Sequence, residues 1–203
     1  MRRALVALVL CGICLAGCGG AGDGVSVIPK GSLDYALPGE TLADWARHGD
    51  QLSVISVINE TRPVTWPGYR NSGGLVGREV TVRVERTLWR RTGVPRAGRV
   101  LHFGVWGWMY DDDQDPHSSR AELVAEGTTR MEVGRRYLAV LVRWRGGWMP
   151  LRDSAVMTLS PDGRVTSDVY EGQPSEGAVA LRGRTLAEAD TLVSDMAGAP
   201  PAP

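Results

Sequence analysis

The strongest constraint on the fold is the strict alternation of apolar and polar residues at Val80–Arg86. Val80, Val82 and Val84 are separated by polar or charged residues, so in a strand the valines would share one face. The segment Arg99–Trp106 repeats the pattern after a turn that is bounded by glycines. A chain with two such segments is expected to form a sheet with one buried and one polar face.

Other segments have the length and composition of further strands. Tyr137–Trp144 is almost continuously apolar, which predicts a central strand that is covered on both faces. Ser160–Gly163 has the composition of a tight turn, so we expect a hairpin around it. A loop rich in Pro, Gly and Asn is expected at Thr61–Gly77. The predicted strands are Leu52–Ile58, Val80–Arg86, Arg99–Trp106, Tyr137–Trp144, Ala155–Leu159 and Val165–Tyr170.

Two helices are expected, one on each side of these strands. Thr41 can cap a short helix at Leu42–His48, with Gly49 in the left-handed conformation at its end. Thr185 and Glu188 have the spacing of a capping box, and an amphipathic helix should follow them. The fold class is therefore mainly β, a small barrel or curled antiparallel sheet of about five to six strands with a short N-terminal helix and a C-terminal amphipathic helix.

The order of these elements resembles that of secreted bacterial proteins with OB-fold or netrin-module barrels. The resemblance rests on the long strand Val80–Leu88 and on the segment Gly134-Arg135-Arg136-Tyr137-Leu138, and it spans Thr41 to Met196. It implies an OB-like barrel. Netrin-type members usually carry disulfides, which this chain lacks after residue 18, so protease inhibition and family site residues are not transferred.

The first residues have the pattern of an export signal. Arg2 and Arg3 precede the apolar stretch Ala4–Ile13, which is shorter than the roughly 20 residues of a membrane-spanning helix. Leu15–Cys18 resembles the lipobox of bacterial lipoproteins, in which the cysteine is acylated and becomes the new N-terminus. We expect a signal peptide at 1–17, a flexible tether at 18–31, one β-rich domain at 32–197 and a disordered tail at 198–203, with Cys18 as the lipidation site.

Charge and composition argue against nucleic acid as a partner. Removal of Arg2 and Arg3 leaves 23 − 2 = 21 basic residues against 23 acidic ones, and the signs alternate along the chain. The basic stripe that phosphate backbones require is missing from this pattern. Lys30 is the sole lysine, and the arginine bias is typical of a GC-rich genome such as an actinobacterium's.

An acidic run supplies a candidate metal site. Asp111, Asp113 and Asp115 could point to one side, and Glu122 follows where an EF-hand would place its last ligand, so calcium is the metal to consider. Pro116 stands where that loop needs glycine. The competing interpretation is a solvated acidic loop without a cofactor.

An aromatic row precedes the acidic run. Trp106, Trp108 and Tyr110 alternate, so in a strand they would project from one face. If exposed, they could stack on sugar rings or hold a partner. If buried, they belong to the core.

Other chemistry has weaker support. His48, His102 and His117 lack the spacing of zinc ligands, and no serine lies in a Gly-x-Ser-x-Gly motif. We expect a lipoprotein on the extracytoplasmic face of the cell membrane, a non-enzymatic module that binds or assembles an envelope protein or polymer. The alternatives are a carboxylate-dependent or calcium-dependent enzyme acting on envelope or extracellular polymer, and a purely structural lipoprotein.

Overall fold

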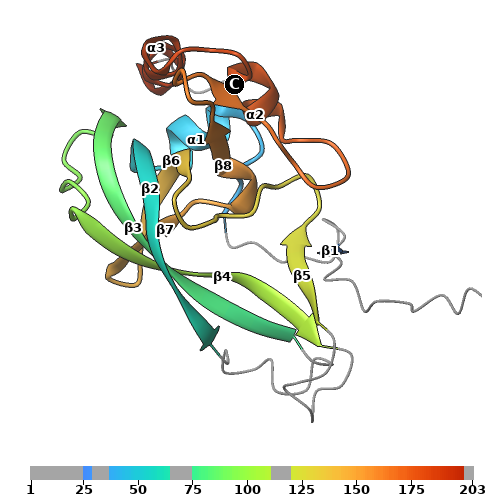
Figure 1. Ribbon diagram of the computed structural model, residues 1–203. Helices are drawn as coiled ribbons and strands as arrows, with labels where there is room; N and C mark the ends of the chain where they lie inside the picture. The colour runs from blue at the N-terminus through green and yellow to red at the C-terminus, as the bar shows by residue number, and fades with distance from the viewer. Residues whose placement is uncertain (1–24, 29–36, 65–74, 111–119, 199–203) are drawn as a thin grey trace, which may run out of the picture.

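A computed structural model describes residues 25–28, 37–64, 75–110 and 120–198 (Figure 1). Nine strands form one sheet within these residues. The strands are β1 (Val25–Ile28), β2 (Gln51–Val64), β3 (Leu75–Arg90), β4 (Val100–Tyr110), β5 (Arg120–Ala125), β6 (Arg136–Trp144), β7 (Gly147–Pro150), β8 (Val156–Leu159) and β9 (Val165–Thr166). The helices are α1 (Leu42–His48), α2 (Glu176–Leu181), α3 (Leu186–Gly198) and the short 3₁₀ helix η2 (Asp153–Ala155).

The sheet is curled and open. Its strand order is β1-β5-β4-β3-β2-β6-β8-β9, and β7 pairs with β6 beside this path. The pairings are antiparallel except that of β1 with β5, which is parallel. Among the described residues, no pairing joins β1 to β9. The predicted mainly β fold with a curled sheet is confirmed, and the predicted count of five to six strands is wrong.

The additional strands are short or polar. β1, β5 and β7 have only 4, 6 and 4 residues, and they are held by backbone pairing with longer neighbours. β1 lies within the segment that we expected to be a flexible tether. The expected loop at Thr61–Gly77 is also partly wrong, because β2 continues to Val64 and β3 begins at Leu75. Backbone pairing with β3 extends β2 from Glu60 to Val64, where the side-chain pattern does not indicate a strand.

Both predicted helices are present, and their first turns have the expected caps. The Asp44 N–H donates to Thr41 Oγ1 over 3.0 Å, and the Thr41 N–H donates to the Asp44 carboxylate over 3.1 Å. At the other end of α1, Gly49 is extended, with φ of −71°, rather than left-handed. The need for glycine here is steric, since a Cβ would lie 2.4 Å from Val140 Cγ1.

Two hydrophobic cores lie on the two faces of β2 and β6. Leu52 and Leu138 face the three helices, whereas Ile55 and Tyr137 face the inside of the curl with the valines of β3. The apolar residues of β6 from Tyr137 to Val142 are all buried, which confirms that both faces of this strand are covered. The hairpin of β8 and β9 is also present as predicted.

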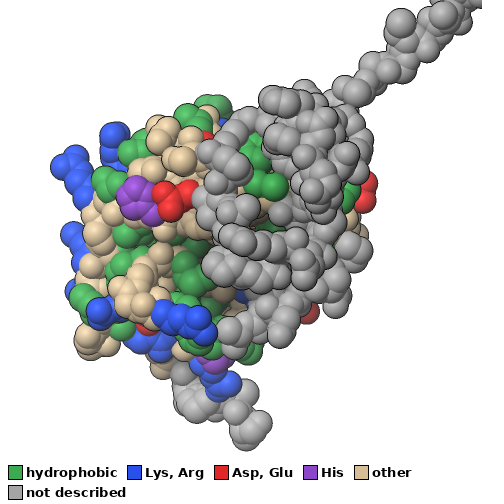
Figure 2. Space-filling model, turned by 90° about the horizontal axis from the view of Figure 1, so that it is seen from below, with side chains coloured by type: hydrophobic (Ala, Val, Ile, Leu, Met, Phe, Trp, Pro, Cys, Tyr) green, Lys and Arg blue, Asp and Glu red, His purple; other side chains and the backbone are tan. Residues whose placement is uncertain are grey.

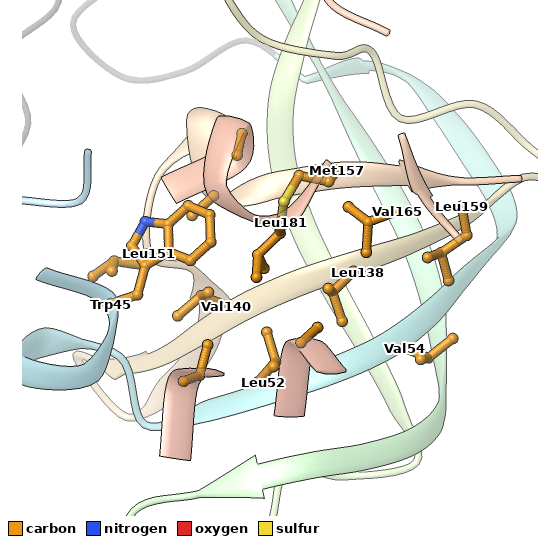
Figure 3. Packing of buried hydrophobic residues seen from close by; sticks show 14 of the residues in the cluster. Trp45, Leu52, Val54, Leu138, Val140, Leu151, Met157, Leu159, Val165 and Leu181 are labelled. Carbon is orange, nitrogen blue, oxygen red and sulfur yellow. The ribbon is translucent and has the colours of Figure 1, made fainter. Parts of the chain in front are cut away.

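Trp45 joins the helical layer to the sheet. Its side chain is fully buried, and its indole N–H donates to the Gly39 carbonyl over 2.8 Å. In Figure 3 its ring lies among Leu151, Leu181 and Val140. A Cβ at Gly177 would lie 2.6 Å from this ring, so α2 can pack here only through a glycine.

No helix within the described residues is long and apolar enough to cross a bilayer.

Truncation of Trp45 should strongly destabilise the fold, because its buried side chain joins the helices to the sheet. We expect Trp45→Ala to lower the free energy of unfolding by about 3–5 kcal/mol, because a large buried ring is lost and a cavity remains. Urea unfolding followed by circular dichroism measures this. The control is Val179→Ala on α2, where the valine is 52% exposed and a change within about 0.5 kcal/mol is expected. Equal effects of the two substitutions would contradict the packing described here.

Candidate functional site

A bulge in β4 separates the two tryptophans of the predicted aromatic row. Trp106 lies opposite Gly77 and Trp108 opposite Val76, so Gly107 is the extra residue. A Cβ on Gly107 would lie 2.3 Å from the Val76 carbonyl oxygen, which explains why glycine occupies the bulge. A bulge interrupts the alternation of side chains along a strand, and the expected common face depended on that alternation.

Neither described tryptophan of the row forms part of an exposed platform. Trp108 is 2% exposed, and the guanidinium carbon of Arg130 lies 5.4 Å from the centroid of its ring. Trp106 is half-buried, and its indole N–H donates to Asp153 Oδ2 over 2.9 Å. The side chain of Tyr110 lies outside the described residues. An exposed row that includes Trp108 is therefore wrong, and the alternative of burial holds for this residue.

Arg78 lies at the centre of a buried polar cluster beneath these tryptophans. Its side chain is 1% exposed and pairs with Glu60, with 2.7 Å between Nη1 and Oε2. Its other N–H groups donate to the carbonyls of Trp106 over 2.9 Å and of Met131 over 2.6 Å. Burial and the nearby Arg130 lower the pKa of Arg78 to about 10. It therefore remains a cation at neutral pH, surrounded by acceptors.

Arg130 is the second cation of this cluster. Its Nη1 donates to the carbonyls of Gly107 and Leu123 over 3.0 and 3.1 Å, and its Nε lies 3.4 Å from Glu122 Oε2. Burial lowers the pKa of Arg130, and the negative charge of Glu122 opposes that shift. Glu122, whose spacing suggested a calcium ligand, thus serves as a counter-ion to Arg130.

Tyr137 extends the cluster to β6. Its hydroxyl donates to the Arg130 carbonyl over 2.9 Å and accepts from the Glu132 N–H over 2.7 Å. Burial raises the pKa of this phenol to about 12. The cavity beside Arg78 and Arg130 has a volume of about 20 Å³, which is room for about one water molecule. The arrangement suits the ordering of backbone segments rather than the binding of a substrate.

Cys18 and the acidic residues Asp111, Asp113 and Asp115 fall outside the described residues, as does His117. His102 is exposed, with Nδ1 3.4 Å from Glu79 Oε1. Within the part of the chain that the structure describes, no group of three His, Cys, Asp or Glu side chains could hold a metal ion.

Sequence reasoning missed the buried cluster, although one signal was available. Arg78 shares the parity of Val80 and Val82, the two fully buried valines of β3. A charged residue on the apolar face of a strand needs buried partners. That position could have identified Arg78, but Arg130 lies outside any regular strand and has no comparable pattern.

Comparison with known proteins finds no family model, no curated protein and no solved structure that matches this chain.

Removal of the Arg78 cation should strongly destabilise the fold. We expect Arg78→Gln to lower the free energy of unfolding by about 3–5 kcal/mol, because Glu60 and two carbonyls lose their buried partner. Urea unfolding measures this loss. The matched control on the same strand is Arg83→Gln, an exposed position where a change within about 0.5 kcal/mol is expected. A loss below about 1 kcal/mol at Arg78 would show that the cluster is dispensable.

Tyr137 should make stability depend on alkaline pH. At about pH 8, Tyr137→Phe is expected to lower the free energy of unfolding by about 1–3 kcal/mol, because two backbone groups lose their partner. The pKa is about 12 in the folded state against 10.0 ordinarily. The contribution of the neutral phenol is therefore full below about pH 10 and is lost as pH rises toward about 12.

The difference between wild type and the Tyr137→Phe variant should accordingly shrink between about pH 10 and pH 12. Chemical denaturation over that range measures it. A difference that stays constant would mean that Tyr137 ionises in the folded state as it does in the unfolded chain.

Proposed function

We propose that this chain is a lipoprotein, anchored through Cys18 to the extracytoplasmic face of the cell membrane, whose folded domain binds or assembles a component of the cell envelope. The observation that carries the proposal is the position of β1. This strand begins seven residues after Cys18 and pairs in register with β5 from Val25↔Glu122 to Ile28↔Ala125.

The short link sets a limit on where the domain can lie. Seven residues span at most about 25 Å when fully extended. A lipid on Cys18 would hold the edge strand of the sheet within that distance of the bilayer, with the rest of the domain extending outward. Stable anchoring requires two acyl chains or an equivalent second signal, and a diacylated cysteine supplies them.

The buried cluster favours a binding or assembly module over the carboxylate-dependent enzyme. Arg78, Arg130 and Tyr137 are occupied by contacts that fix the backbone of β4, of β5 and of the β5–β6 connection. A rigid domain of this kind suits presentation of a preformed surface, because little ordering is needed when a partner binds. The resemblance to OB-fold or netrin-module proteins stays a prediction and does not contribute to this proposal.

Substitution of Cys18 tests the anchor. We expect the wild-type protein to fractionate with membranes at the mass of a chain that begins at an acylated Cys18. Cys18→Ala should release the chain into the medium or leave it unprocessed, because the acyl acceptor is lost. Cell fractionation with intact-protein mass spectrometry measures both. Cys14→Ala, within the expected signal peptide, is the control and should leave retention unchanged.

Membrane retention of Cys18→Ala at mature mass would overturn the anchor. The binding role is tested by mild crosslinking in intact cells, followed by purification of the lipidated protein and mass spectrometry. A reproducible envelope component that is absent from the Cys18→Ala sample is expected. Its absence from the wild-type sample would overturn the binding role.

A further inference from the structure

One face of the molecule carries its basic side chains at separate places rather than in one stripe (Figure 2). Figure 2 shows them in blue at separate places, among hydrophobic and polar side chains. One group of arginines is nevertheless concentrated by the fold. Arg86 of β3 and Arg96 and Arg99 of the β3–β4 connection line a single open groove of about 490 Å³.

These three arginines have no ionic partner among the described residues. The other charged residue at the groove is Glu85, and its carboxylate accepts from Arg136 Nε over 2.9 Å. Three arginines and one glutamate that is already paired therefore line the groove. An excess of positive charge in a concave surface attracts anions, since low-dielectric walls strengthen the local potential.

Two neighbouring arginines, in contrast, are bound to acceptors of the fold. Arg91 of the same connection donates to the Gly49 carbonyl over 3.1 Å from Nε, and it pairs with Asp50 at 3.3 Å. Arg90 Nη1 donates to the Val94 carbonyl over 2.5 Å. Those two arginines hold the connection in place, whereas Arg86, Arg96 and Arg99 make no such contact within the described part of the chain.

The backbone that carries these arginines is fixed from the core. Gln51 is fully buried; its Oε1 accepts from the Ala97 N–H over 3.1 Å, and its Nε2 donates to Ser53 Oγ over 2.6 Å. The Val84 N–H donates to the Arg99 carbonyl over 2.9 Å. A ligand would therefore meet arginines on an ordered backbone, which reduces the entropy lost on binding.

We propose that this groove binds the phosphate groups of an anionic polymer of the cell envelope. Guanidinium groups match phosphate oxygens with paired, charge-assisted hydrogen bonds. The groove is far larger than one phosphate and its three cations come from separate positions, so successive groups of one polymer fit it better than a single ion.

The position of the groove favours a polymer over the membrane that carries the anchor. β5 pairs with the end of β4 at Trp108–Tyr110, and β1 pairs with β5. The groove lies at the other end of β4, at the β3–β4 connection before Val100 (Figure 1). Eight residues of strand separate Val100 from Trp108, which is about 25 Å. This step rests on the proposed function, because it takes the β1 side as the side nearest to the lipid.

The test uses the full lipidated protein in non-ionic detergent and linear polyphosphate as the probe. We expect binding by isothermal titration calorimetry that weakens as salt is raised. Single substitutions Arg86→Gln, Arg96→Gln and Arg99→Gln should each weaken it about tenfold, and the triple variant about 100-fold or more. Arg143→Gln, an exposed arginine of β6, should change it less than about twofold.

Three results with polyphosphate would overturn the proposal. These are the absence of polyphosphate binding by the wild type, unchanged affinity of the triple variant, and equal loss with Arg143→Gln. Circular dichroism of each variant separates loss of binding from loss of folding, and the single variants retain the test if the triple variant unfolds. Stronger groove-dependent binding to phosphatidylglycerol vesicles than to polyphosphate would replace the polymer with a lipid headgroup and so overturn the assignment.

The experiments distinguish a wrong assignment of the groove from a wrong assignment of the lipid anchor. The triple variant should stay in the membrane fraction, because retention depends on Cys18. Cys18→Ala should still bind polyphosphate, because the groove lies in the folded domain. Loss of only one property would refute the proposal that predicts it and leave the other standing.

Discussion

Two buried arginines, Arg78 of β3 and Arg130 of the β5–β6 connection, bind backbone groups of several segments of the curled sheet. Arg78 connects β2, through Glu60, to the carbonyls of Trp106 in β4 and Met131 after β5. Arg130 makes a second set of bonds to β4 and β5. Removing two cations from water costs several kcal/mol each unless every donor finds an acceptor. The segments that supply those acceptors are therefore held in place together, including the connection from β5 to β6, whose backbone also bonds to Tyr170 and to Val57 of β2.

The same sheet supports two cores because β2 and β6 are apolar on both faces. Alternation along β2 directs Leu52 and Val54 to the helices and Ile55 and Val57 into the curl. Domains of this size can fold without disulfides when enough surface is buried. Here a single pair of central strands contributes to both cores, so the two layers share one scaffold and their packing is coupled through it.

The sequence predicted the parts of this fold whose signal is local. The valines of β3, the apolar run of β6 and the caps at Thr41 and Thr185 each imply one element directly. The curled form of the sheet also followed from the strand content. The short strands β1, β5 and β7 could not be predicted in this way, because they form only when a longer strand offers free backbone groups. The candidate site was less predictable, since the bulge at Gly107 moved Trp108 into the core.

Patterns in the sequence predict least where residues that are distant along the chain form the ion pairs. The positive charges of Arg86, Arg96 and Arg99 do not show in the net charge of the chain, because acidic residues elsewhere balance them. Folding pairs those acids with other cations: Glu60 with Arg78, Glu85 with Arg136, Asp50 with Arg91. The net charge of the chain is unchanged by folding, but the distribution of charge is set by which ion pairs the fold brings together. A nearly neutral chain can thus carry a positive groove, and the composition that argues against a basic stripe is compatible with a local anion site.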